Sequence, residues 1–456
     1  MLPHAAEMDR VARVPDPLLA DPNPGLLRAL LHAIYDLTWV LFLLIASPWW
    51  LGRSIYDKSF RSMVVRRLTV SLPGPVDSKR ERLLVHGVSV GEIKGAQSLV
   101  QALAESHPEL EVVLCTTTDT GEQVARKLYP DHLILRFPID LSWCVMRFLK
   151  RVRPSSIVLI ELEIWPNFLR CANQLGLPVA VVNGRITENS FGNYRIFRSA
   201  LPQFNRISLF CAQDERYAER FKDLARSADR VIETGNIKID GLRLGRVSPA
   251  EEIARLAGGA AGQVVLVAGS THEREEVWFV ESCRASFPEA RLVLVPRHPQ
   301  RTRDVERSLT AIGAEPQLLS RLRSGEALER SRPLLVDTIG ELEGIYALAD
   351  LVFIGGSLIE HGGQNMLEPA AQGRAVLYGP HVENFRQEAR LLEAAGAARR
   401  VTGPEELTVA LRELHANPAR IEEMGRAGIR ALEAQGGAAQ VTLSALEERL
   451  FAPRAL

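Results

Sequence analysis

The chain has 456 residues, of which 46% are hydrophobic and 24% charged, an ordinary globular composition that is long enough for two or three domains. Lys and Arg together number 55, as do Asp and Glu, so the formal net charge is zero. Without a basic excess, we expect no nucleic-acid partner. The five cysteines lie far apart in the sequence, which matches neither a disulfide framework nor a zinc knuckle and favours a reducing, cytoplasmic setting.

The N-terminal region is the first to depart from a soluble average. Residues 1–28 are expected to form a disordered tail, because they are polar and rich in proline. Residues 37–52 are uncharged, and when this segment is extended back to Ala29 it approaches the roughly 20 residues that a helix needs to cross hydrocarbon. The sequence therefore predicts a membrane anchor with a basic juxtamembrane segment over residues 29–67.

The flanks of this segment indicate its orientation. Trp49 and Trp50 stand where an interfacial aromatic belt would lie, and five basic residues follow them: Arg53, Lys58, Arg61, Arg66 and Arg67. The positive-inside rule then places the rest of the chain on the cytoplasmic side of the membrane, held by a single N-terminal anchor. Two alternatives stay open, a buried core helix and a helix that lies flat in the membrane interface.

After residue 80, short apolar runs alternate with helical patterns in two series. The first series begins at residues 83–85 and the second at residues 264–268, and both read as buried parallel strands with crossover helices. A glycine-flanked linker without strand signals separates them. We expect an α/β protein with two doubly wound halves facing a cleft, one over 68–243 and the other over 244–456, with the final helices as candidates for packing back on the first half.

Polar residues at strand ends mark the candidate chemistry of the first half. Glu92 closes the run HGVSVGE in the first turn of a predicted helix, where it is either a base that accepts a proton or simply a helix-capping residue. Glu161 and Glu163 follow the apolar run SIVLI and point the same way if the strand continues. Surface placement of both acids is equally compatible with their spacing.

In the second half, the residue pattern predicts an anion site. Ser270 and Thr271 stand at a strand-to-helix turn, and Arg297 ends the next strand, although a lone arginine there is often only solvated. The Gly-rich stretch 355–363 offers backbone amides to a phosphate, unless its glycines only shape a connection. There is no GxxxxGK[ST] or GxGxxG motif and no metal-ligand clustering of histidines, so we expect a metal-independent site without a cofactor.

Nine motifs in register carry a resemblance over residues 34 to about 395: HGVSVGE, TTTDTG, ELEIWPN, VNGRIT, GNIKID, GSTHERE, PRHP, DTIGEL and GGQNMLEP. In this order they resemble the 3-deoxy-D-manno-octulosonic acid (Kdo) transferases of lipopolysaccharide assembly. The resemblance implies a two-domain GT-B glycosyltransferase fold, an N-terminal anchor at the cytoplasmic face of the bacterial inner membrane, a CMP-Kdo donor and a lipid A precursor as acceptor. It also implies an inverting transfer that needs no metal, with the acceptor bound by the first half and the CMP-sugar by the second.

The resemblance further implies roles for single residues. Glu92 would be the general base, and Glu163 and Lys238 would stabilise the transition state. The CMP moiety would contact Pro296, Arg297, Ile339, Gly340, Glu341, Asn365, Met366, Leu367 and Glu368. From the residue pattern, Ser270 and Thr271 are additional candidates for phosphate contacts.

The sequence departs from the family pattern at two positions near these motifs. Gln364 stands where the family often has histidine, and Arg274 stands where it often has glycine. Two rival functions remain alongside Kdo transfer: another GT-B nucleotide-sugar transferase or epimerase, and a membrane-tethered binding protein without turnover. The number of Kdo residues added, the acyl chains required and the oligomeric state do not follow from the sequence.

Overall fold

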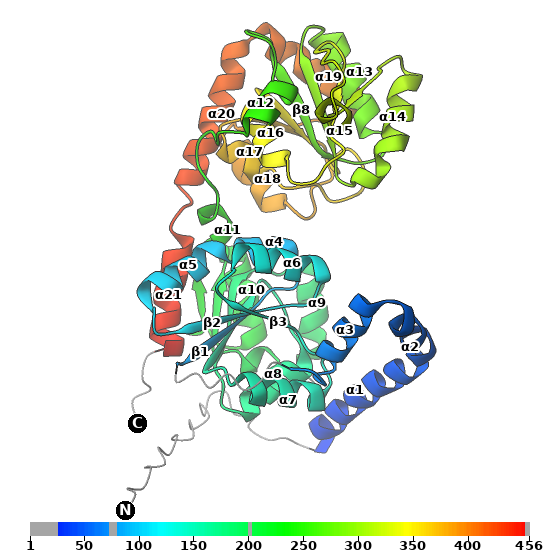
Figure 1. The fold of residues 1–456 in the computed structure, drawn as a ribbon. Coiled ribbons are helices and arrows are strands. Elements are labelled where there is room, and N and C mark those ends of the chain that lie inside the picture. Colours follow the sequence, from blue (N-terminus) through cyan, green and yellow to red (C-terminus); the bar gives the residue numbers. More distant parts are fainter. Residues whose placement is uncertain (1–25, 73–79, 199–202, 452–456) are drawn as a thin grey trace, which may run out of the picture. The chain divides into compact units, whose positions relative to one another are not determined.

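The computed structural model describes residues 26–72, 80–198 and 203–451, so residues 1–25 of the predicted tail lie outside the described residues. The chain divides into two compact units, Met1–Gly241 with Gly437–Leu456 (unit 1) and Leu242–Gly436 (unit 2). Each unit is built on its own parallel sheet (Figure 1).

Unit 1 has a seven-stranded sheet in the order β3-β2-β1-β4-β5-β6-β7, and every strand pair is parallel. The order reverses between β1 and β4, which makes this pair the switch point of the sheet. Its strands are rich in buried Val, Leu and Ile, as expected of a sheet covered on both faces. Their bounds are β1 Arg82–His86, β2 Glu111–Thr116, β3 Leu133–Arg136, β4 Ser156–Ile160, β5 Val179–Gly184, β6 Leu209–Ala212 and β7 Val231–Glu233.

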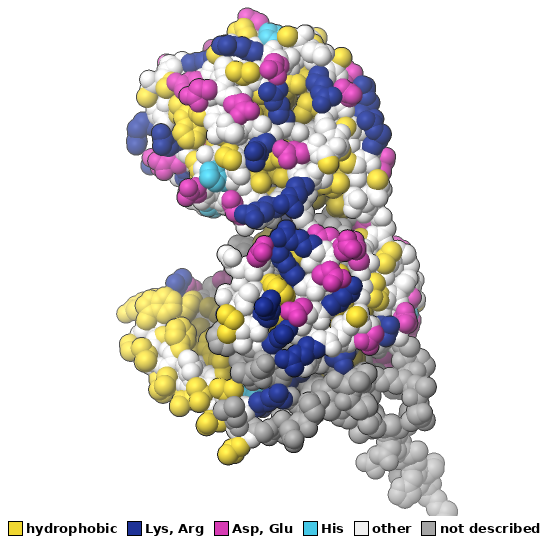
Figure 2. All heavy atoms as spheres, turned by 180° about the vertical axis from the view of Figure 1, so that it is seen from behind, with side chains coloured by type: hydrophobic (Ala, Val, Ile, Leu, Met, Phe, Trp, Pro, Cys, Tyr) yellow, Lys and Arg dark blue, Asp and Glu magenta, His cyan; other side chains and the backbone are white. Residues whose placement is uncertain are grey.

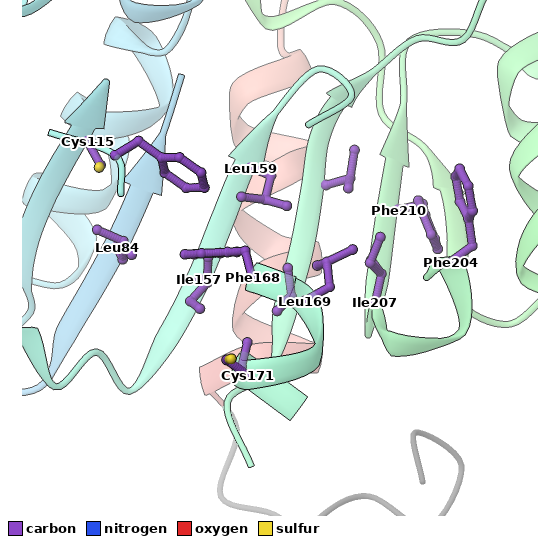
Figure 3. Packing of buried hydrophobic residues seen from close by; sticks show 14 of the residues in the cluster. Leu84, Cys115, Ile157, Leu159, Phe168, Leu169, Cys171, Phe204, Ile207 and Phe210 are labelled. Carbon is purple, nitrogen blue, oxygen red and sulfur yellow. The ribbon is translucent and has the colours of Figure 1, made fainter. Parts of the chain in front are cut away.

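Helices cover both faces of this sheet. On one face α7 and α8 pack their apolar sides against alternate strand residues such as Leu84 and Ile157; Figure 3 shows Phe168 and Leu169 of α8 over the strands. On the other face lie α4, α5 and the last helix, α21. The helices after the N-terminal segment are α4 Val90–Gly95, α5 Gln97–Ser106, α6 Asp119–Leu128, α7 Ser142–Val152, α8 Pro166–Gln174, α9 Glu188–Phe197, α10 Glu215–Ala225, α11 Ile237–Asp240 and α21 Ala438–Leu446.

The last helix belongs to unit 1 although the preceding 195 residues form unit 2. Leu443 and Leu446 of α21 enter the same apolar cluster as Leu99 of α5. The carboxylate of Asp240 also accepts hydrogen bonds from the backbone N–H groups of Gly437, at 2.7 Å, and Ala439. The apolar face of α21 and this carboxylate clamp therefore fix the chain end to unit 1.

Unit 2 repeats the architecture with the strand order β10-β11-β9-β8-β12-β13-β14, and its switch point lies between β8 and β12. The strands are β8 Val265–Thr271, β9 Arg291–Pro296, β10 Gln317–Leu318, β11 Leu334–Leu335, β12 Leu351–Ile354, β13 Ala375–Tyr378 and β14 Ala398–Arg400. The helices are α12 Glu251–Ala257, α13 Glu275–Ser286, α14 Thr302–Ala311, α15 Leu319–Arg323, α16 Leu342–Leu348, α17 Leu367–Ala371, α18 Arg386–Ala394, α19 Pro404–Ala416 and α20 Pro418–Glu433.

The apolar N-terminal segment forms three helices, α1 Leu26–Ile45, α2 Ser47–Tyr56 and α3 Lys58–Arg67. The uninterrupted apolar run of residues 37–52 is therefore not one helix, because it breaks at Ala46. Pro48 has no N–H to continue the ladder and would clash with the carbonyl of Leu44, which instead accepts a hydrogen bond from the Ser47 hydroxyl at 2.7 Å. The part that is long and apolar enough to cross a membrane is Arg28–Ile45, with mean hydropathy 1.6.

Only 6% of that window is buried, so the apolar surface of α1 faces outward. Figure 2 shows hydrophobic side chains gathered on this three-helix segment. Its exposed large side chains are Leu26, Leu30, Ile34, Leu37, Val40, Leu41, Phe42, Leu44, Ile45, Trp49, Leu51, Ile55 and Tyr56. Contiguous exposed apolar surface of this kind marks a membrane or protein interaction site.

Candidate active site and donor-binding loops

Glu92 is fixed at the switch point of unit 1, directly after β1. It is the third residue of α4, whose N-cap Ser89 accepts a hydrogen bond from the Glu92 backbone N–H at 3.3 Å. The Glu92 carboxylate reaches back and accepts from the Ser89 hydroxyl at 2.7 Å and from the Val88 N–H at 2.8 Å. Glu92 therefore does act as a capping residue, and the same contacts hold its carboxylate in one orientation.

The surroundings of Glu92 make it a better proton acceptor than a solvated glutamate. Its side chain is 9% exposed, and burial raises its pKa, while the bonds from Ser89 and Val88 oppose that rise. The charge of Glu161 raises the pKa further, and Lys238 lowers it. A raised pKa increases the basicity of the carboxylate, as general base catalysis requires.

Glu161 directly follows β4 in the left-handed region, with φ 65°, so the strand does not continue to Glu163 and the strand-based expectation for the two side chains does not apply. The carboxylate of Glu161 pairs with Nζ of Lys238 and accepts from Nε of Arg185 at 2.8 Å. Burial acts to raise the pKa of Glu161, but the two cations hold it below its usual value. Glu161 is thus an ionised partner that positions Lys238.

The pKa of Glu163 is shifted in the opposite direction to that of Glu161. Burial and the charge of Glu92 raise the pKa of Glu163 to about 7. The hydrogen bond that Nε1 of Trp165 donates to its carboxylate, at 2.8 Å, acts to lower this pKa. Like charges that share a site disfavour simultaneous ionisation, so Glu163 is only partly ionised near neutral pH. The structure therefore brings together Glu92, Glu163 and Lys238, the residues that the resemblance singles out.

Lys238 reaches this cluster along α4. It lies in the short helix α11, whose first residue, Ile237, donates its N–H to Oδ1 of Asn183 at 3.1 Å. A Cβ on Gly95 would lie 2.8 Å from Cγ of Lys238, so the lysine chain passes directly over this glycine. Gly95 leaves the room that the aliphatic part of Lys238 occupies.

The CMP candidates of unit 2 gather after four neighbouring strands, β11, β9, β8 and β12. Arg297 is exposed after β9, and its N–H bonds to the carbonyl of Thr271 at 2.9 Å, which joins two of these loops. Thr271 itself is fully buried and donates its hydroxyl to Glu276 at 2.9 Å, whereas Ser270 is half-buried. Parallel strands end at one edge of the sheet, so these loops share that edge.

The remaining CMP candidates present different atoms. Ile339 is 83% exposed, the neighbouring Gly340 has φ 100°, and Glu341 accepts from Arg323 at 2.8 Å. Asn365 donates to Glu368 at 3.1 Å. Pro296, Met366 and Leu367 are buried, so their side chains serve the core.

The Gly-rich stretch has an internal carboxylate partner. Glu275, whose side chain is fully buried, accepts the N–H groups of Gly356 at 2.7 Å, Ser357 at 3.1 Å and Leu358 at 3.0 Å. We expected these amides to reach a phosphate, but they bind this carboxylate instead. Position 355 requires glycine because of close packing: a Cβ there would lie 2.3 Å from the Ser270 carbonyl oxygen.

Gln364 and Arg274, the two departures from the family pattern, both contact aromatic rings. Nε2 of Gln364 lies 3.4 Å from Nε2 of His272, whose ring is tilted against that of His361 with centroids 3.9 Å apart. Burial and the nearby His361 and His298 lower the pKa of His272 to about 4. Arg274 adopts φ 77° before α13, and its guanidinium stacks on Trp278.

Comparison with known proteins assigns the family. Residues 64–241 match the family model of the 3-deoxy-D-manno-octulosonic acid transferases. The transferase of Bordetella pertussis is 35% identical over 385 residues, covering 80% of this chain and 87% of the relative, and that of Haemophilus influenzae is 30% identical, covering 81% and 87%. The chain belongs to the Kdo transferase family. It is thus a glycosyltransferase of the class that uses CMP-Kdo.

Solved structures support the fold of this Kdo transferase. The UDP-N-acetylglucosamine 2-epimerase of Neisseria meningitidis is 14% identical with a TM-score of 0.56, covering 81% of this chain and all of that one. A glycosyltransferase of Rickettsia africae is 10% identical with a TM-score of 0.56, covering 81% and 98%. These likenesses and the two parallel sheets establish the expected GT-B fold, and at such identities they show the fold alone.

Sequence reasoning missed the partners that hold the candidate site residues in place. Arg185 lies in the motif VNGRIT, but nothing in its spacing links it to Glu161, 24 positions earlier. Glu275 appears in the sequence as one acid among several at the start of a helix, and only its burial identifies it as a clamp. Among the described residues no group of three or more His, Cys, Asp or Glu is placed to hold a metal ion.

Proposed function

We propose that this Kdo transferase transfers Kdo from CMP-Kdo to a lipid A precursor at the cytoplasmic face of the inner membrane, with inversion at the anomeric carbon. The observation that carries the proposal is the buried Glu92 carboxylate, held by Ser89 and Val88 at the switch point of unit 1. Ligands of doubly wound sheets bind outside the carboxyl ends of the strands at that point. The family membership supports the donor and the reaction.

In the proposed step Glu92 removes the proton of the acceptor hydroxyl. The hydroxyl oxygen forms a bond to the anomeric carbon of Kdo as the bond from that carbon to the phosphate oxygen breaks, and CMP leaves with the electron pair. CMP departs without protonation if its charge is stabilised, so the reaction needs a base more than an acid. Attack from the face opposite the leaving group inverts the anomeric centre.

Two further residues of unit 1 assist this step. Lys238 places a positive charge beside the three carboxylates, and Glu163, with its pKa raised to about 7, is protonated in a substantial fraction of molecules near neutral pH. Both can donate hydrogen bonds to oxygen atoms that become more negative in the transition state. Electrostatic stabilisation of this kind is worth more in a partly dry site than in water.

Unit 2 is proposed to hold the donor. Arg297 is exposed at the end of β9 and can meet the phosphate, while Asn365 and Glu368 offer hydrogen-bonding groups to ribose hydroxyls. Backbone groups of Ile339, Gly340 and Glu341 complete the CMP contacts. The Glu275 clamp excludes the amides of residues 356–358 from this role.

We propose that α1–α3 attaches the protein to the membrane by lying in the interface. The middle of α1 is bound to unit 1, because the Tyr35 hydroxyl donates to Asp140 at 3.0 Å and Asp36 accepts from the N–H of Ser142 at 2.9 Å. A helix held this way along its polar side presents its apolar side to lipid, as interfacial helices do. Burying these two polar residues in hydrocarbon would be costly, which disfavours a span.

The test is mass spectrometry of a tetraacyl lipid A precursor incubated with CMP-Kdo and the purified full-length protein. The wild type should add one or more Kdo masses, and Glu92→Gln should lose activity by about 10²–10⁴-fold. Glu105→Gln is the matched control, because Glu105 is exposed on the neighbouring helix α5. Wild-type protein that leaves the lipid unmodified, or Glu92→Gln that transfers normally, would refute the proposal.

The rival function is another nucleotide-sugar reaction on the same fold, as in the epimerases that share it. A thermal-shift titration separates the two, because the Kdo transferase should be stabilised by CMP and not by UDP. Stabilisation by bound ligand follows RT ln(1 + [L]/Kd), so the larger shift identifies the preferred nucleotide. A shift with UDP alone would favour the rival.

A further inference from the structure

A hollow on the outer surface of α7 and α8 combines positive charge with apolar walls. Its volume is about 800 Å³. Among the described residues that line it there are four cationic side chains and no acidic one; the cations are Arg147, Lys150, Arg151 and Arg170. Such a concentration of one charge sign in a concave site attracts anions.

The rest of the lining suits hydrocarbon. Trp143 is 56% exposed and Val70 is 60% exposed, and Met146 and Leu72 lie beside them. The guanidinium of Arg147 lies 5.8 Å from the ring centre of Trp143, so one cation is seated on an aromatic face. A ligand that satisfies both parts of the lining carries an anionic head and an apolar chain.

The hollow adjoins the three-helix segment at two places, the middle of α1 and the chain that follows α3. Ser142 in its wall is bonded to Asp36 of α1 and also accepts from Arg170, whose guanidinium lies 4.0 Å from the Asp36 carboxylate. Val70 and Leu72 follow α3 directly in the chain and line the hollow as well. An amphipathic pocket beside an interfacial helix segment is within reach of bilayer lipid.

The hollow is separate from the proposed catalytic site. Helices α7 and α8 pack on one face of the sheet, and α4, which carries Glu92, packs on the other face. The lining of the hollow contains none of Glu92, Glu163 and Lys238, so an acceptor sugar seated there would not meet the proposed base. The occupant is therefore distinct from the reacting acceptor.

We propose that this hollow binds one anionic phospholipid of the surrounding bilayer, its phosphodiester between Arg147 and Lys150 and an acyl chain against Trp143. Membrane attachment, which is part of the proposed function, brings the hollow to the lipid, but the binding chemistry stands on the lining itself. The bound lipid would fix unit 1 against the membrane at a second point beside α1–α3.

The test measures binding to full-length protein in detergent by titration calorimetry. The ligands are dioctanoylphosphatidylglycerol, dioctanoylphosphatidylcholine and glycerol phosphate. Dioctanoylphosphatidylglycerol should bind. Dioctanoylphosphatidylcholine should bind at least tenfold more weakly because it has no net charge, and glycerol phosphate should bind at least tenfold more weakly because it has no acyl chain. Equal binding of the two lipids, or glycerol phosphate binding as tightly as phosphatidylglycerol, would overturn the proposal.

The paired variant Arg147→Gln with Lys150→Gln should weaken phosphatidylglycerol binding roughly 25-fold, at about fivefold for each charge near a lipid surface. The single variant Arg147→Lys keeps the positive charge and should bind phosphatidylglycerol nearly as tightly as the wild type does. The matched control replaces Arg303 and Arg307 of α14 by Gln, removes the same charge from unit 2 and should leave the binding unchanged. A paired variant that binds like the wild type would overturn the proposal.

Lipid binding and transfer are separate readouts. A wild type that selects phosphatidylglycerol but transfers no Kdo would refute the proposed function and leave the lipid site standing. Competitive displacement of phosphatidylglycerol by the lipid A precursor, together with inhibition of transfer by phosphatidylglycerol, would instead assign the hollow to the acceptor and overturn this inference.

Discussion

The ammonium of Lys238 and the carboxylate of Glu161 form an ion pair between α11 and the end of β4, 77 positions apart in the chain. The other side of the same carboxylate accepts from Arg185 at 2.8 Å. One carboxylate thus pairs with two cations, of which Lys238 acts on the charge of Glu92. The pair places the lysine where the proposed reaction needs positive charge.

Removing the charge of Glu161 should release Lys238. We expect Glu161→Gln to lower kcat for Kdo transfer at least tenfold, with a smaller change in KM for CMP-Kdo, because Glu161 positions a group of unit 1 and does not contact the nucleotide. Glu161→Asp should recover part of the activity. Steady-state kinetics check this, and an unchanged kcat in Glu161→Gln would contradict the positioning role.

A Cβ at Gly95 should displace the lysine chain while strengthening the helix. Gly95→Ala improves helix propensity by about 1 kcal/mol, so the melting temperature should hold or rise, yet the new methyl group would lie 2.8 Å from Cγ of Lys238. We expect reduced activity in a protein of undiminished stability. Gly91→Ala is the control, because its Cβ would meet the Ser89 hydroxyl at 3.8 Å; equal activities in the two variants would rule this effect out.

The raised pKa of Glu163 predicts a pH-dependent contribution to stability. Its pKa is about 7 in the folded state and 4.5 in the unfolded state, so the folded state binds more protons between these values. The contribution is fully present below pH 4.5 and is lost as the pH rises through 7. The melting temperature of the wild type relative to Glu163→Gln should therefore fall between pH 5 and pH 8. A difference that is constant across this range would disprove the shift.

The Glu275 clamp should be a stability determinant of unit 2. Glu275→Ala leaves the buried N–H groups of Gly356, Ser357 and Leu358 without their acceptor, and each unsatisfied buried group costs about 1–3 kcal/mol. We expect destabilisation of about 3 kcal/mol or more, seen as a clear drop in melting temperature. Glu281→Ala, on the exposed side of the same helix α13, should melt like the wild type.

If CMP still protects the Glu275→Ala variant against heating, the clamp supports the loop without forming the nucleotide contacts. If instead the variant melts like Glu281→Ala, the buried carboxylate contributes nothing to the fold of unit 2 and the argument from its hydrogen bonds is wrong.

Much of the protein could be predicted from the sequence. Runs such as IVLI are short, apolar at every position and bounded by polar residues, as strands buried on both faces are, so the parallel sheets and the loops that carry Glu92, Glu163 and Arg297 follow from local pattern. The ordered motifs specified the family, and the capping geometry of Glu92 follows from Ser89 three residues before it.

Tertiary structure decided the contacts between segments that are remote in sequence. The pairing of Lys238 with Glu161, the occupation of the Gly-rich loop by Glu275 and the return of α21 to unit 1 depend on which strands are neighbours. The sequence pattern of a segment shows which of its side chains are buried, because side-chain periodicity reflects burial. It does not show which residues of another segment they contact. The identity of the partner depends on the packed fold, where desolvation compels each buried charge to find an opposite charge or a hydrogen bond.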